Sequence, residues 1–81
     1  MIDEIDEELI DSIQKREEII KQIGTFKKEH NITIFQLERW QEILKSRAQW
    51  ADKRNISRSH IEKLCQLLHE ESIKIQNEIG N

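Results

Sequence analysis

Two cations lie where the helical pattern of this sequence predicts burial. In residues 2–30 an apolar stripe with spacings of three and four residues passes through Arg16 and Lys27. Burying a cation without a counter-charge is costly. The two positions are eleven residues apart, almost in phase and about 16 Å along a helix axis. Their long side chains are therefore placed to lean toward a small organic dianion.

Four further polar residues share this property. Gln36 and Arg39 lie beside the apolar stripe of a second helical pattern, and Ser72 and Gln76 lie one turn apart on the stripe of a third. Taken singly, each has an ordinary interpretation: an arginine that reaches solvent or meets a glutamate of a partner helix, or a serine that bonds to its own backbone. Taken together, cations and neutral donors without a readable base or nucleophile suit conformational capture and charge stabilisation rather than proton transfer.

Several other classes of site and function are disfavoured. His30, His60 and His69 show no metal-ligand spacing and are expected at helix ends or surfaces, so no metal or cofactor is predicted. The net charge is −3 with acids and bases interleaved, which argues against nucleic acid and membrane partners. The acidic N-terminus has no secretory signal pattern and no apolar run reaches transmembrane length, so a cytoplasmic protein is expected. Cys65, the single cysteine, is expected to be a small buried apolar residue.

The periodicity predicts an all-α fold with one very long N-terminal helix. Helices are expected at about 2–30, 36–52 and 58–79 within a single domain, 1–81. Asn31 is suited to a left-handed cap after the first helix. Ser57 or Ser59 can begin the third, and Ser59 with Glu62 has capping-box spacing.

The length of the first helix predicts a homodimer. A helix of 29 residues would be about 44 Å long, whereas a compact globule of 81 residues has a radius of gyration of roughly 12 Å. Its apolar stripe continues along the whole length, so a second copy is expected to cover what one chain cannot.

With these residues assembled, the sequence resembles the all-helical class of chorismate mutase from Ile2 to Ile79. The opening I-D-x-I-D-x-x-L is present at residues 2–9, and an arginine follows ten residues after its second aspartate, as Arg16. The family's other signatures are I-G-x-x-K, a second-helix arginine and S-x-x-x-Q, matched here by residues 23–27, Arg39 and residues 72–76.

The resemblance implies an intertwined homodimer that rearranges chorismate to prephenate, an isomerase reaction of aromatic amino acid biosynthesis. By this likeness Arg16, helped by Ser72, would bind a substrate carboxylate. Lys27 and Gln76 would donate hydrogen bonds to the ether oxygen, where negative charge grows, and Arg39 would organise the remaining carboxylate region.

The sequence departs from the family pattern at three places. Gln36 stands where an aspartate is usual, Trp40 replaces the glutamate that meets the substrate hydroxyl, and a partner-reaching arginine would fall before Met1. Residues 34–40 are most similar to a mutase domain fused behind a DAHP synthase, so a fused or associated DAHP synthase domain is expected. Two alternatives stay open: isochorismate pyruvate lyase activity, and a non-catalytic helical dimerisation or regulatory module.

Overall fold

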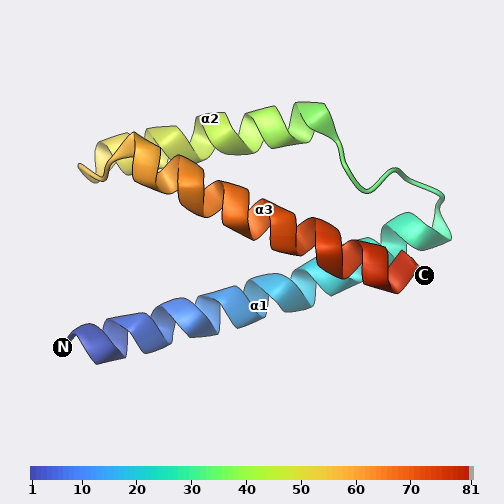
Figure 1. The fold of residues 1–81 in the computed structure, drawn as a ribbon, viewed down its shortest axis with the longest axis horizontal. Coiled ribbons are helices and arrows are strands. Elements are labelled where there is room, and N and C mark those ends of the chain that lie inside the picture. Colours follow the sequence, from blue (N-terminus) through green and yellow to red (C-terminus); the bar gives the residue numbers. More distant parts are fainter. Residues whose placement is uncertain (81) are drawn as a thin grey trace. The chain divides into compact units, whose positions relative to one another are not determined.

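Three α-helices make up the regular structure of the described residues (Figure 1). The computed structural model describes residues 1–80; Asn81, the last residue of the expected domain, lies outside them. The helices are α1 (Ile2–Glu29), α2 (Leu37–Lys53) and α3 (Arg58–Gly80), and residues 1–80 contain no strand. Every bound lies within one residue of the expected range. The all-α class with a long first helix, 28 residues, is confirmed.

An asparagine in the left-handed conformation ends both α1 and α2. Asn31 has φ 55° and Asn55 has φ 56°. After α1, Ile32 N–H donates to the Lys27 carbonyl at 2.8 Å, and Asn31 N–H donates to the carbonyl one residue further on, at 3.4 Å. The corresponding bonds from Ile56 and Asn55 follow α2. This is the Schellman pattern, in which asparagine tolerates the conformation that most residues avoid. The cap expected at Asn31 is therefore confirmed.

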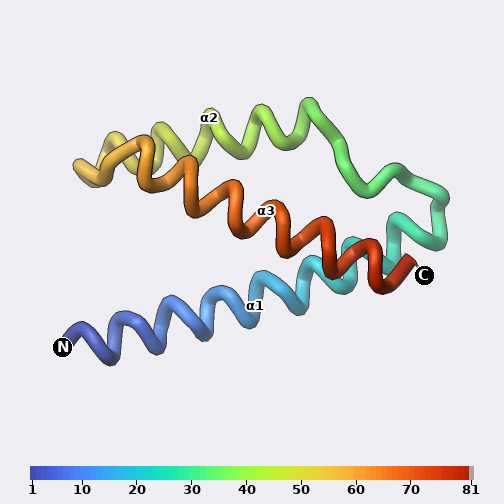
Figure 2. The backbone as a smooth tube through the Cα atoms, in the orientation of Figure 1, coloured from blue at the N-terminus to red at the C-terminus, as the bar shows by residue number. Residues whose placement is uncertain are grey.

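The third helix begins after Ser57 and not after Ser59. The Ser57 hydroxyl accepts a hydrogen bond from His60 N–H at 3.3 Å, the N-cap arrangement for a helix that starts at Arg58. The capping box expected between Ser59 and Glu62 is therefore wrong, because both residues already lie inside the helix. The Schellman turn at Asn55 leaves Ser57 in position to cap, and the backbone turns tightly between α2 and α3 (Figure 2).

The chain forms two compact units, to both of which α3 contributes. The first is Met1–Ile34 with the end of α3 from Lys74, and the second is Phe35–Ile73. In the first unit Lys28 Nζ donates to the Ile79 carbonyl at 3.2 Å, which satisfies a carbonyl of the last turn of α3. The second unit is built on α2 and the first part of α3.

The apolar core of the described chain is small. Its buried apolar residues are Ala48, Ala51, Cys65 and Ile75, and no large side chain among the described residues is completely buried. Cys65 is thus the small buried residue that was expected. Within residues 1–80, no helix combines the length and the apolar character that crossing a membrane would require.

Candidate active site

In the first unit α1 and α3 approach closely at Gly24. A Cβ atom on Gly24 would lie 3.1 Å from Cγ of Gln76, 3.3 Å from its Cα and 3.2 Å from Cδ1 of Ile79. All three distances are shorter than ordinary van der Waals contact, so a glycine permits this approach and a larger residue would not. The result is that Gln76, only 5% exposed and with its Oε1 buried, is held against α1.

Lys27 follows Gly24 by one helical turn on the same side of α1. Its Nζ donates to the Ile34 carbonyl at 2.7 Å, which ties the side chain to the segment after the helix. Partial burial lowers the pKa of Lys27, because desolvation disfavours the charged ammonium. An ammonium group has three N–H donors, so this hydrogen bond leaves donors for a bound molecule.

Arg16 is half-buried on the same helix, three turns before Lys27. The separation of about 16 Å along the axis means that the two cations do not bind one small group from directly opposite sides. Each must instead approach a different end of an extended ligand. A molecule with anionic groups at separate positions fits that requirement better than a compact anion.

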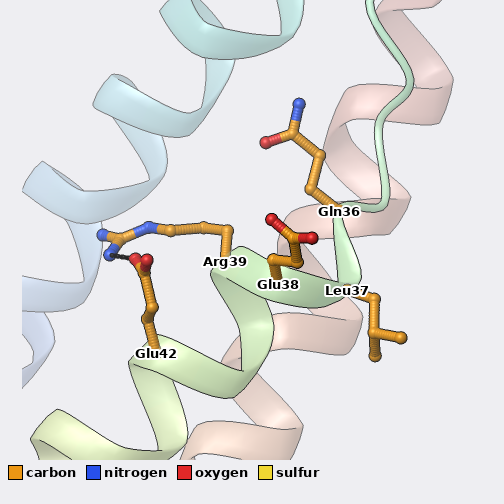
Figure 3. A pocket seen from close by; sticks show the side chains of 5 residues that line it. All are labelled: Gln36, Leu37, Glu38, Arg39 and Glu42. Atoms are coloured by element: carbon orange, nitrogen blue, oxygen red, sulfur yellow. Dashed lines mark hydrogen bonds and ion pairs between the residues drawn. The ribbon is translucent and has the colours of Figure 1, made fainter.

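In the second unit, Gln36 and Arg39 line an open pocket at the start of α2 (Figure 3). Arg39 reaches toward Glu42, and its Nη1 lies 3.4 Å from Oε2 of that residue. Both partners are exposed, so the ion pair contributes little to stability and is easily exchanged for another anion. The expectation that Gln36 and Arg39 lie near a buried stripe is wrong for this chain, because both side chains are exposed.

Ser72 lies on α3 and is 5% exposed. Its Oγ donates to the Leu68 carbonyl at 2.8 Å, the local bond that serines commonly make inside helices. This bond to the helix's own backbone is the ordinary interpretation that the sequence suggested for Ser72. The hydroxyl oxygen retains lone pairs, and the hydrogen can rotate toward another acceptor.

Trp40 is half-buried at the start of α2 and stacks on a histidine of α3. The indole and the His69 imidazole have centroids 4.0 Å apart and planes inclined by 17°. Phe35 approaches the same imidazole edge-on at 5.6 Å. The expectation that His69 lies at a helix end or surface is therefore wrong. Sequence spacing could have identified it, because His69 precedes Ser72 by three residues and so shares its side of α3.

Comparison with known proteins identifies the family. The family model described as chorismate mutase type II matches residues 1–77. The chain belongs to the chorismate mutase type II family. It is 35% identical over 79 residues to the T-protein of Haemophilus influenzae, an alignment that covers 98% of this chain and 21% of that protein. The chain thus spans about a fifth of the length of this relative. No solved structure matches the chain significantly.

The predicted site residues of this chorismate mutase family member fall into two groups, one in each compact unit. Lys27 and Gln76 belong to the first unit and lie near the close approach at Gly24. Arg16 belongs to the same unit and lies nearer the N-terminus of α1. The other four, which belong to the second unit, are Gln36, Arg39, Trp40 and Ser72. The described residues contain no cluster of three or more histidine, cysteine, aspartate or glutamate side chains that could hold a metal.

The close approach predicts that Gly24→Ala destabilises this chorismate mutase chain. Alanine gains about 1 kcal/mol in helix propensity, but overpacking costs about 1–3 kcal/mol where backbone atoms of Gln76 cannot yield. We expect a net loss of about 1 kcal/mol in the free energy of unfolding, measured by urea denaturation at fixed protein concentration. Gly80→Ala is the matched control, because a Cβ there meets nothing within 4 Å. A Gly24→Ala variant as stable as the Gly80→Ala variant would contradict the close approach.

Proposed function

We propose that this chain is an isomerase that converts chorismate to prephenate. Membership of the chorismate mutase type II family supports the reaction. The observation that carries the mechanism is the close approach at Gly24, which holds the buried Gln76 against α1, and Lys27 follows Gly24 by one turn of that helix. The rearrangement breaks the ether C–O bond and forms a C–C bond within one molecule, so it needs no proton transfer.

In this mechanism Lys27 and Gln76 donate hydrogen bonds to the ether oxygen. Negative charge grows on that oxygen as the C–O bond breaks, and preorganised donors in a water-poor site stabilise it more in the transition state than in the ground state. The hydrogen bond from Lys27 to Ile34 supports the role, since it fixes the ammonium before substrate binds. Gln76 is likewise held in place by burial.

The remaining predicted residues bind the substrate and select its reactive conformer. Arg16, with the Ser72 hydroxyl, binds one carboxylate, and Arg39 organises the region of the other. Supporting this, Arg39 pairs with the exposed carboxylate of Glu42, which a substrate carboxylate can displace. Gln36 lines the same pocket, and Trp40 replaces a hydroxyl-binding side chain with an aromatic surface. Holding the two reacting ends together removes a conformational-entropy cost.

The working form proposed for the chain is a homodimer. Along α1 large apolar side chains remain exposed, for example Ile5 at 60% and Leu9 at 52%, and Gly24 is the only buried residue of that helix. An exposed apolar stripe of this length favours burial against another protein surface. A second copy of the chain supplies the same stripe and can cover it by symmetry.

Wider assignments rest on the sequence. The single domain 1–81, a cytoplasmic location and association with a DAHP synthase domain stay predictions. The association with a DAHP synthase domain is supported by residues 34–40, whose sequence resembles that of mutase domains fused behind a DAHP synthase.

Chorismate turnover tests the proposed function. We expect purified protein to consume chorismate and not isochorismate, and Lys27→Ala to lower kcat by a factor of about 10²–10³, the usual loss for one preorganised donor. Because burial lowers the pKa of Lys27, the ammonium loses its proton at lower pH than an ordinary lysine. The value of kcat/KM for the unaltered chain should therefore fall with rising pH, and this fall should begin below 10.5, the ordinary pKa of lysine.

Lys27→Arg is the matched control in this assay, since a guanidinium stays charged throughout that range and should remove the alkaline decline. Absence of turnover, or full turnover in Lys27→Ala, would contradict the proposal. Turnover of isochorismate alone would assign the lyase reaction instead.

Light scattering after size-exclusion chromatography tests the dimer. At micromolar concentration the unaltered chain should have twice the mass of one chain. Leu9→Glu should dissociate it, because burial of an unpaired carboxylate at the interface costs several kcal/mol. Glu8→Gln, on the neighbouring exposed position, is the control and should stay dimeric. A stable folded monomer of the unaltered chain would contradict the dimer.

A further inference from the structure

Three rings meet where the second unit joins the start of α2 to α3. Phe35, Trp40 and His69 form this ring cluster: Trp40 stacks on the imidazole with centroids 4.0 Å apart, and Phe35 meets it edge-on at 5.6 Å. Both Trp40 and His69 are half-buried. Stacked and edge-on arrangements at these separations are the favoured geometries for aromatic pairs. The cluster is therefore a specific contact between the two helices.

The ring cluster takes the place of a side-chain cap at the start of α2. Gln36 is the N-cap residue, in extended conformation, and makes no side-chain capping hydrogen bond. Phe35 and Trp40 occupy the positions just before the cap and four residues into the helix, where a hydrophobic staple fixes the entry of the chain. Here both staple residues contact the imidazole of His69 instead of relying on local packing alone. The first turn of α2 is thereby fixed to α3.

Each member of the ring cluster neighbours a residue of the proposed active site. Phe35 precedes Gln36 and Trp40 follows Arg39 in the sequence, while His69 lies one turn before the buried Ser72. Arg39, in the first turn of α2, is held by an exposed ion pair, which contributes little to its position. The rings are a firmer link than this ion pair between the start of α2 and the part of α3 that bears Ser72.

We infer that His69 is a positioning residue, which sets the alignment of Arg39 and Gln36 with Ser72 by stacking on Trp40. It acts through its flat ring and takes no part in the chemistry. Its effect on turnover rests on the proposed function, whereas its effect on the first turn of α2 does not. Loss of the stack should loosen that turn and lower the fraction of bound substrate held in the reactive conformer, so kcat should fall more than KM rises.

Hydrogen exchange and kinetics on matched variants test the inference. In His69→Leu, which has an apolar side chain of similar size but no flat ring, amide exchange of residues 37–44 should accelerate by about tenfold and kcat should fall by about tenfold, the scale of one aromatic pair. His69→Phe keeps the stack and should restore both values to within about twofold. His60→Leu replaces an exposed histidine of the same helix and should change neither.

The outcomes separate stacking from other roles and from the proposed function. Unchanged amide exchange and kcat in His69→Leu would overturn the inference. A His69→Phe variant as impaired as His69→Leu would also overturn it, because the polar atoms of the imidazole would then be required. A fall in thermal stability with normal kcat per folded protein would overturn it as well. If the unaltered chain shows no turnover, the proposed function fails, and the exchange of residues 37–44 still decides whether His69 positions the start of α2.

Discussion

The close approach of α1 and α3 at Gly24 is the constraint on which the donor arrangement depends. With Cα of Gln76 only 3.3 Å from the position of an added Cβ, the two helices meet backbone to backbone. That contact holds Gln76 against α1, and Lys27 follows Gly24 by one turn of the same helix. A larger residue at position 24 would push Gln76 and Ile79 away from α1. Glycine is a poor helix former, and this close packing gives a physical reason for its place inside α1.

The polar residues of α3 and those at the start of α2 differ in burial, and the difference fits the proposed roles. Gln76 and Ser72 on α3 are buried, as preorganised donors require. Gln36 and Arg39 are exposed around an open pocket, where a substrate can enter and displace a weak ion pair. Rigid donors and accessible cations together suit a reaction whose catalyst must hold a flexible dianion in one conformation.

Local rules in the sequence account for the helices, whereas tertiary contacts decide much of the site. Periodicity and the asparagine at position 31 were sufficient to place α1, and the apolar stripe of the third helix correctly indicated that Ser72 and Gln76 are buried. Periodicity could not show that Arg39 is exposed, because this residue lies beside the apolar stripe of α2 and not on it. Nor could it show that His69 stacks on Trp40, because that pair is 29 residues apart and depends on how α2 and α3 pack.

The pH dependence of turnover by Gln76→Glu tests the central claim most directly, namely that the buried group at position 76 donates a hydrogen bond to the ether oxygen. A protonated carboxyl can donate that bond, whereas an ionised one repels the growing negative charge. We expect kcat/KM of this variant to rise as pH falls, toward the value of the unaltered chain, whereas kcat/KM of the unaltered chain should not rise over that acidic range. A variant whose kcat/KM follows the same pH profile as the unaltered chain would contradict the claim.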